Sequence, residues 1–156
     1  MKANCKFSSG MIASLVAAVL SVVSFVIYQV NISGAGYFAS ASVTAMPLVW
    51  AAVAALVIAV ALGMVKAKGV ASRALDLLAG LLQLAAPALL AYCLISLIGG
   101  RVEGLGYIYF SNADVAKEVQ TAANLSSATW AIVSMVACGV SMLAAIVASF
   151  FNLRKD

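Results

Sequence analysis

The stretch MIASLVAAVLSVVSFVIYQV, residues 11–30, contains no charged side chain. A helix that crosses the hydrocarbon core of a bilayer needs about 20 predominantly apolar residues, and this stretch has that length. Three later stretches have the same apolar character, at about residues 43–65, 74–98 and 128–151. The sequence therefore predicts an all-α integral membrane protein in which four transmembrane helices form a bundle.

The composition of the whole chain agrees with this fold class. Of the 156 residues, 65% are hydrophobic and 9% are charged, whereas an ordinary soluble domain has about 25% charged residues. A soluble fold could not bury so much apolar surface. We expect one membrane domain over residues 1–156, with outer loops at 31–42 and 99–127, and the length is that of a single domain.

The Lys and Arg residues indicate how the chain is oriented. On a path of four spans, all but two of these nine residues fall on one side. That side receives Lys2, Lys6, Lys66, Lys68, Arg73, Arg154 and Lys155, and the other side receives Arg101 and Lys117. By the positive-inside rule, both termini face the cytoplasm, and the expected location is the cell (plasma) membrane. This placement explains the net charge of +4 without a nucleic-acid partner.

A cleaved signal peptide is the alternative interpretation of the first apolar stretch. Lys2 and Lys6 precede it, and Ala39-Ser40-Ala41 resembles a cleavage site. Signal-peptide cores have about 7–15 apolar residues, and this stretch is longer and ends well before Ala39, so we favour an uncleaved span. The triplets Asn31-Ile32-Ser33 and Asn124-Leu125-Ser126 match glycosylation sequons on the predicted outer side, and the host stays open.

Two glycine-rich stretches suggest that a helical hairpin occurs twice. Gly34-Ala35-Gly36-Tyr37-Phe38 precedes the second span, and Gly104-Leu105-Gly106-Tyr107-Ile108 precedes the fourth. Trp50 and Trp130 then occupy similar places in the spans that follow. Parallel repeats of this kind are related by an axis along the membrane normal. Chance similarity is the alternative, because the composition is rich in Gly, Ala and Val.

We expect each Gly-x-Gly to form a sharp turn just outside the bilayer, because glycine tolerates positive φ. The aromatic residues that follow would then lie on the membrane surface, where amphipathic rings are favoured. The alternative is a contact surface for an outer partner, formed by Tyr37, Phe38, Tyr107, Tyr109 and Phe110. In the second outer loop, Ser111 and Asp114 suggest a capping box, and the apolar spacing predicts a surface helix at about 113–123.

Small residues at helical spacing predict close packing of the spans. One set is Ala51, Ala55, Ala59 and Gly63 in the second span, and another is Ala137, Ser141, Ala145 and Ser149 in the fourth. The first span has a seam with alternating spacings of three and four, formed by Ser14, Ala17, Ser21, Ser24 and Tyr28. A polar path is the alternative, but a serine hydroxyl can bond to its own helix, so we favour packing.

Gln83 and Pro87 distinguish the third span. The proline ring removes one helix hydrogen bond and clashes with the carbonyl of Gln83, so a kink is expected. Gln83 is the only carboxamide deep in a span, and we favour an interhelical hydrogen bond for it over a hinge or a substrate contact. Asp76 near the inner end is expected to pair with Arg73 or to reach the interface.

The sequence shows no set of residues typical of catalysis. It has no histidine, which is the most common general base and metal ligand. No carboxylate lies in the middle of a span, and Cys5, Cys93 and Cys138 are too isolated for a zinc site or a disulfide framework. We therefore predict no enzyme activity, no catalytic or metal residue and no cofactor.

The function class is inferred from what remains. We expect a non-catalytic membrane subunit or an assembly or scaffold protein, which acts through helix packing and its aromatic outer loops. Its partners would be the lipid bilayer and another membrane protein or a second copy of itself. The alternative is a small oligomeric transporter or channel with a path near Gln83 and Pro87.

Overall fold

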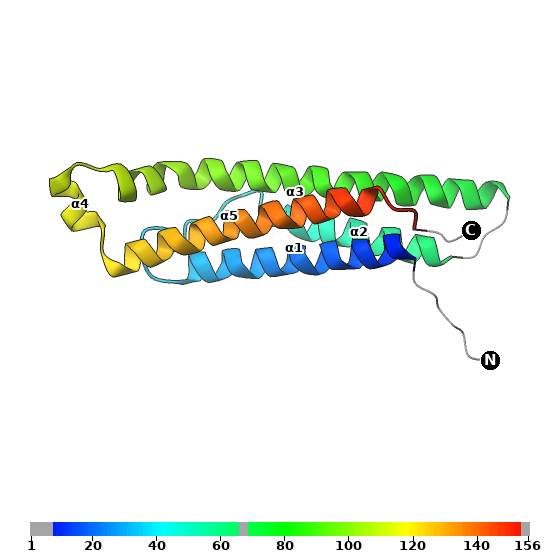
Figure 1. Ribbon diagram of the computed structural model, residues 1–156, viewed down its shortest axis with the longest axis horizontal. Coiled ribbons are helices and arrows are strands. Elements are labelled where there is room, and N and C mark those ends of the chain that lie inside the picture. The colour runs from blue at the N-terminus through cyan, green and yellow to red at the C-terminus, as the bar shows by residue number, and fades with distance from the viewer. Residues whose placement is uncertain (1–7, 66–68, 154–156) are drawn as a thin grey trace, which may run out of the picture.

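The computed structural model describes residues 8–65 and 69–153. They form five helices, which are labelled in Figure 1: α1 Ser9–Ser33, α2 Leu48–Met64, α3 Val70–Phe110, α4 Ala113–Val119 and α5 Ala122–Ser149. The described residues contain no β-strand. The predicted all-α fold class is confirmed.

Three of these helices have the length and composition of membrane spans. α1, α3 and α5 are long and apolar enough to cross a bilayer, and α2 is a shorter apolar helix. Their outer faces are apolar, since side chains such as Val16, Leu81 and Val140 are exposed. Serines such as Ser14 and Ser134 are instead fully buried. Exposed apolar faces around a more polar interior are what a bilayer requires, so this is a membrane protein.

The four long helices lie side by side along the longest axis, with α4 at one end (Figure 1). α1 packs against α5 and α2, and α3 packs against α2 and α5. Hydrogen bonds at both ends fix the direction of α5 relative to α1. Ser8 Oγ donates to Asn152 O over 2.8 Å, and Asn31 Nδ2 donates to Ser127 O over 2.8 Å. These two helices are therefore antiparallel.

The buried faces of α1 and α5 consist mostly of small residues that alternate at spacings of three and four. The buried positions of α1 include the predicted seam Ser14, Ala17, Ser21, Ser24 and Tyr28. Those of α5 include Ser127, Ala131, Ser134, Cys138, Ser141, Ala145 and Ala148. Small side chains allow two helix backbones to approach closely, which is how helices associate in lipid. The seam predicted for the first span is confirmed as a buried face.

The four-residue ladder predicted for the second span is only partly buried. Ala55 and Ala59 are buried, Gly63 is half-buried and Ala51 is exposed. The buried face of α2 passes through Val49, Ala52 and Leu56 instead. Successive steps of four residues rotate by about 40° around an α-helix, so a strict ladder leaves the contact face within a few turns. In α5, Ser141 and Ala145 are buried, while Ala137 and Ser149 are half-buried.

Residues 99–110, the first part of the segment 99–127 that was predicted as an outer loop, are helical. α3 continues to Phe110, and Gly104 and Gly106 lie within it. The turn expected at Gly104-Leu105-Gly106 does not form, because the helix buries Gly104 and Ile108 against other parts of the chain. Ile108 packs in a cluster with Phe38, Ala128 and Ala131. Tertiary burial here outweighs the local preference of glycine for turns.

The predicted surface helix at 113–123 is shorter than expected. α4 ends at Val119, and α5 begins at Ala122 rather than near residue 128. Asn112 caps α4 by accepting a hydrogen bond from Val115 N, and Thr121 caps α5 by accepting one from Asn124 N. Ser111, the expected cap, instead donates its hydroxyl to Tyr107 O. Two strong N-cap residues so close together divide the segment into two helices.

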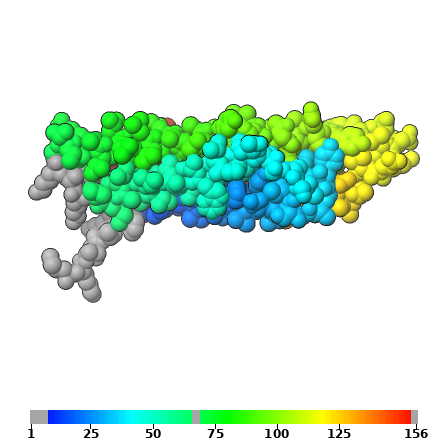
Figure 2. All heavy atoms as spheres, turned by 180° about the vertical axis from the view of Figure 1, so that it is seen from behind, coloured from blue at the N-terminus to red at the C-terminus, as the bar shows by residue number. Residues whose placement is uncertain are grey.

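α3 is much longer than a bilayer is thick. Its 41 residues rise about 61 Å, twice the roughly 30 Å of a hydrocarbon core. Its last turns, α4 and the first turns of α5 form a projection, residues 99–129, which we call the outer hairpin because it forms one end of the molecule. Figure 1 shows this hairpin extending past the end of α1, and Figure 2 shows α4, in yellow, at one tip of the rod-like molecule.

Candidate functional site

The outer hairpin and the loop 34–47 that lies against it carry several exposed aromatic side chains. Tyr37, Tyr107 and Tyr109 are each almost half exposed, and Phe110 is 88% exposed. The rings of Tyr37 and Tyr107 lie with their centroids 6.0 Å apart. We call these four residues the aromatic surface. Four of the five residues predicted as a partner contact therefore remain accessible.

Phe38, the fifth predicted contact residue, is not accessible. Its side chain is 2% exposed and belongs to the cluster with Ile108, Ala128 and Ala131. Its backbone N–H donates to Ser127 Oγ over 3.1 Å. The preceding Tyr37 stacks edge-on against its ring, with centroids 5.2 Å apart. Phe38 thus supports the aromatic surface from below.

The two glycine-rich stretches contact each other, and they have different conformations. A Cβ atom placed on Gly104 would lie 2.5 Å from Tyr37 Cε1 and 2.6 Å from Phe38 Cε1. Gly36 has φ +116°, and a Cβ there would lie 2.5 Å from Ala123 O. Gly104 therefore lets the rings of Tyr37 and Phe38 approach α3 closely. Gly36 instead permits a loop conformation that L-residues rarely adopt.

Arg101 is a buried cation, whereas the sequence alone indicated only a charge of the predicted outer loop. It lies on the buried face of α3 between Leu97 and Gly104 and is 1% exposed. Its Nη2 donates to Ala41 O over 2.7 Å, and its guanidinium lies 4.7 Å from the centroid of the Phe38 ring. In the part of the chain that the structure describes, its Nε has no hydrogen-bond partner. The three- and four-residue spacing of buried α3 positions was the signal that could have revealed it.

Other polar contacts hold loop 34–47 in place. The N–H of Val43 donates to Tyr28 Oη over 2.6 Å, and the N–H of Ser40 donates to Ile32 O over 2.8 Å. Asn31, at the end of α1, is 2% exposed and bonded to Ser127 O, so this predicted sequon is buried. Arg101, Tyr28 and Ser127 together anchor the segment that carries Tyr37.

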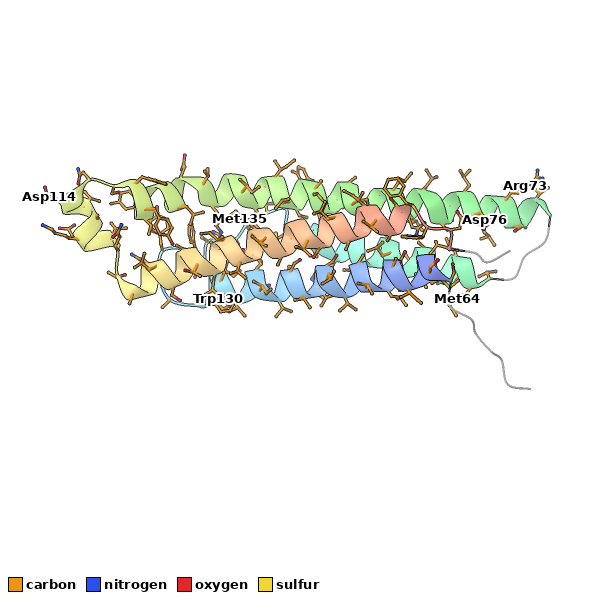
Figure 3. The ribbon with its side chains drawn as sticks, in the orientation of Figure 1. Met64, Arg73, Asp76, Asp114, Trp130 and Met135 are labelled. Atoms are coloured by element: carbon orange, nitrogen blue, oxygen red, sulfur yellow. The ribbon has the colours of Figure 1, made fainter. Side chains whose placement is uncertain are left out.

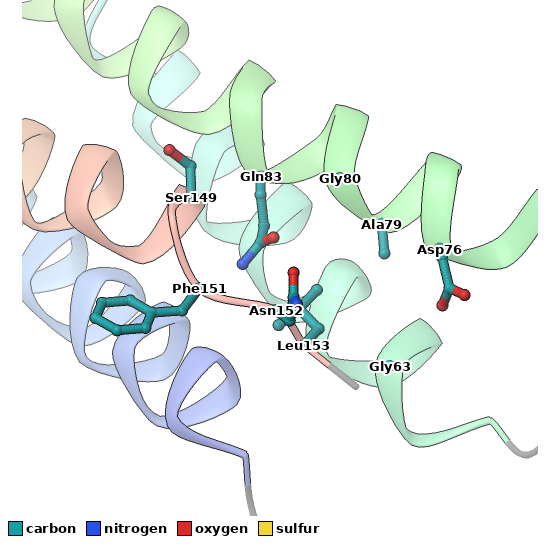
Figure 4. A pocket seen from close by; sticks show the side chains of 9 residues that line it. All are labelled: Gly63, Asp76, Ala79, Gly80, Gln83, Ser149, Phe151, Asn152 and Leu153. Atoms are coloured by element: carbon teal, nitrogen blue, oxygen red, sulfur yellow. The ribbon is translucent and has the colours of Figure 1, made fainter. Parts of the chain in front are cut away.

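A pocket opens at the opposite end of the molecule (Figure 4). It has a volume of about 330 Å³. Its walls include Gly63 of α2, Asp76, Gly80 and Gln83 of α3, and Asn152 and Leu153 after α5. Figure 3 shows Arg73 and Asp76 near this end and Asp114 at the other. The pocket and the aromatic surface are therefore far apart.

Gln83 connects three helices beside this pocket. Its Nε2 donates to Ser14 Oγ of α1 over 3.0 Å and to Ala148 O of α5 over 3.2 Å. The predicted interhelical hydrogen bond of Gln83 is confirmed. Pro87 is buried on the same face, and α3 is helical on both sides of it.

The cysteines and basic residues singled out in the sequence do not form a site in the described part of the chain. Cys93 and Cys138 are free and buried. Cys5 and the basic residues Lys2, Lys6, Lys66, Lys68, Arg154 and Lys155 lie outside the described residues. Within residues 8–65 and 69–153, no three His, Cys, Asp or Glu side chains are grouped so that they could hold a metal ion.

Comparison of the chain with family models, with curated proteins and with solved structures found no match. Its class is therefore defined by the structure alone: an all-helical membrane protein with an exposed aromatic surface at one end and a polar pocket at the other.

Proposed function

We propose that this chain is a non-catalytic membrane subunit or assembly protein, which binds another membrane protein or a second copy of itself through the aromatic surface. In this proposal, all four long helices cross the cell membrane as a bundle of two hairpins. Both termini and the segment between α2 and α3 face the cytoplasm, as the basic residues indicate. The 17 residues of α2 are at the lower limit of about 17–25 for a span.

The position of the aromatic surface along α3 carries this proposal. The part of α3 without charged side chains, residues 77–100, exposes large apolar side chains from Leu77 to Ile98, a rise of about 32 Å that matches a hydrocarbon core. The exposed Val102 lies beyond this part, next to the exposed Glu103. Tyr107 lies about 14 Å of helix rise beyond Ile98. The headgroup layer adds only roughly 5–8 Å on each side. If α3 stands upright in the membrane, Tyr107 and the aromatic residues after it lie beyond the lipid headgroups. There, contact with a protein explains their exposure better than a position at the membrane–water interface does.

The aromatic surface has the properties of an interface centre. Tyr is enriched among the residues that contribute most to protein–protein binding, and such residues act best on a rigid support. Phe38, Gly104 and Arg101 provide that support from below. The tip of the outer hairpin, which follows Phe110 in the chain, carries the exposed charged residues Asp114, Lys117 and Glu118 on α4.

The double variant Tyr107→Ala plus Tyr109→Ala tests the proposal. Native mass spectrometry of protein extracted in mild detergent from its own host would measure the mass of the assembly. We expect at least tenfold less companion chain or homo-oligomer, with unchanged helix content and thermal unfolding.

Tyr92→Ala is the matched control, because Tyr92 is also exposed on α3 but lies within the apolar stretch. It should leave assembly unchanged. If the double variant and the control assembled like the original chain, the aromatic surface would not be the contact.

A transporter or channel with a path near Gln83 and Pro87 is the second candidate. The pocket that reaches Gln83 favours it. Against it, Ser21 and Ser134 are fully buried and donate to carbonyls of their own helices, Ala17 O and Ala131 O. These seams therefore support packing more than a polar path.

A further inference from the structure

The chain after α5 folds back across the end of the bundle that carries the pocket. Residues 150–153, which we call the C-terminal segment, follow Ser149, the last residue of α5. The N–H groups of Phe150 and Phe151 donate to carbonyls in the last turn of α5 over 3.2 Å. Asn152 O then accepts a hydrogen bond from Oγ of Ser8, the N-cap residue of α1, over 2.8 Å. The segment therefore joins the end of α5 to the beginning of α1.

Leu153 anchors the C-terminal segment between three other helices. Its side chain is 7% exposed. It belongs to a cluster to which each of these helices contributes: Met11 of α1, Ala59 and Val60 of α2, and Ala79 of α3. The other three residues of the segment are exposed. A single apolar side chain thus holds the segment against the bundle.

Two glycines make room for the C-terminal segment. A Cβ at Gly10, in the first turn of α1, would overlap Asn152 O and lie 2.9 Å from Phe151 O. A Cβ at Gly63, near the end of α2, would lie 3.0 Å from Leu153 Cβ. The atoms next to Gly10 belong to the backbone of the segment, so they cannot turn aside as a flexible side chain can. A larger residue at Gly10 must therefore displace the segment.

The C-terminal segment also forms one side of the pocket. Phe151, Asn152 and Leu153 line it together with residues of α3 such as Gly80 (Figure 4). Ala79 belongs both to the wall of the pocket and to the cluster around Leu153. The pocket and the space that Leu153 occupies are therefore adjacent, and removal of the segment would join them.

The contacts of the C-terminal segment are few compared with those of the helices. Only Leu153 of its four residues is buried, whereas buried positions run along α1 and α5 from end to end. Local opening of a folded protein occurs most readily in segments with few buried apolar contacts and an exposed backbone. The segment should therefore detach at a lower cost in free energy than any of the long helices.

From these observations we infer that the C-terminal segment is a lid, which opens and closes the pocket while the helix bundle stays folded. In the closed state, which the structure shows, Leu153 fills the space between α1, α2 and α3. In the open state, Ala79 and the adjoining wall of the pocket are accessible from this end of the molecule. This lid goes beyond the partner contact proposed for the aromatic surface and does not depend on it.

The reaction of a cysteine beneath the lid with a water-soluble maleimide tests this role. The reporter is Ala79→Cys in a Cys5→Ser background, because Ala79 is 3% exposed. The native Cys93 and Cys138 are buried and should not react. Protein purified in mild detergent presents both ends to the reagent, so the result is independent of membrane orientation. Intact mass measured over time gives the labelling rate.

Leu153→Asp should open the lid, because it removes the one apolar anchor. We expect it to accelerate labelling of Ala79→Cys at least tenfold. Phe150→Asp is the matched control within the same segment, since Phe150 is 82% exposed, and it should leave the rate unchanged. Equal rates with and without Leu153→Asp would overturn the lid.

Gly10→Val and Gly99→Val form a second matched pair. The valine at residue 10 would occupy the place of Asn152 O, whereas a Cβ at Gly99 would meet nothing within 4 Å. We expect Gly10→Val to accelerate labelling of Ala79→Cys at least fivefold and Gly99→Val to leave it unchanged. The same rate in both variants would show that the segment does not lie against Gly10, and the lid would be wrong.

A second reporter, Ala86→Cys, distinguishes a lid from loosening of the whole bundle. Ala86 is fully buried on α3 and belongs to a different cluster from Leu153. It should stay unreactive in Leu153→Asp and Gly10→Val, with unchanged helix content. A parallel gain of reactivity at Ala79→Cys and Ala86→Cys would mean that the bundle itself opens, and this outcome would overturn the lid.

Discussion

At the residue scale, Gly104 and Gly106 belong to one motif, but only Gly104 is closely packed against other side chains. A side chain at Gly104 would clash with the rings of Tyr37 and Phe38, whereas one at Gly106 would meet nothing within 4 Å. The Phe38 ring is buried in a cluster with Ile108, so it has little room to move away. The first glycine is required by packing and the second is not.

Substitution of each glycine by alanine should therefore change stability in opposite directions. Gly104→Ala overpacks the aromatic cluster and should lower the free energy of unfolding by roughly 1–3 kcal/mol. Gly106→Ala should raise it by up to about 1 kcal/mol, because alanine is the better helix former. Denaturant titration in one detergent measures both. Equal stability of the two variants would mean that loop 34–47 does not press on α3 in solution.

At the element scale, the α1–α5 contact depends on the size of its serines more than on their hydroxyl groups. Ser21 Oγ donates to Ala17 O within α1, and Ser141 Oγ donates to Ala137 O within α5. Neither hydroxyl joins the two helices. Close approach of the backbones, which small residues permit, is the main source of the association.

Two substitutions at Ser21 separate size from polarity. Ser21→Ala keeps the size and should change the free energy of unfolding by less than about 0.5 kcal/mol, because no partner on α5 is lost. Ser21→Leu should lower it by roughly 1–3 kcal/mol or more, since Ser21 is fully buried at the seam. A large loss in Ser21→Ala would contradict the contact described between α1 and α5.

At the scale of the whole molecule, the asymmetry between the two ends is the main feature. The outer hairpin extends past the end of α1 (Figure 1), whereas the opposite end carries the polar pocket and the first and last described residues. Hydrogen bonds of Arg101 and Ser127 hold loop 34–47 against the hairpin, and that of Tyr28 holds it against α1. The proposal that this end of the molecule binds a partner outside the membrane builds on this asymmetry.

The proposed orientation gives a direct labelling result. In a Cys5→Ser background, Lys117→Cys on α4 should react with a membrane-impermeant maleimide added to intact cells. Arg73→Cys, at the other end of the molecule, should react only after permeabilisation (Figure 3). Both sites are exposed, so accessibility to solvent does not limit either reaction. Labelling of Arg73→Cys alone in intact cells would reverse the topology.

The sequence by itself determined the fold class, the approximate apolar spans and the seam of α1, because hydropathy and residue periodicity are local properties. It also indicated most of the aromatic surface and the interhelical role of Gln83. It did not predict that α3 continues to Phe110, that Phe38 is buried or that Arg101 faces the interior. These features depend on which segments meet in space: glycine favours a turn locally, but burial of Ile108 against α5 and loop 34–47 keeps the segment helical. The pocket, too, arises only where the ends of α2 and α5 meet α3.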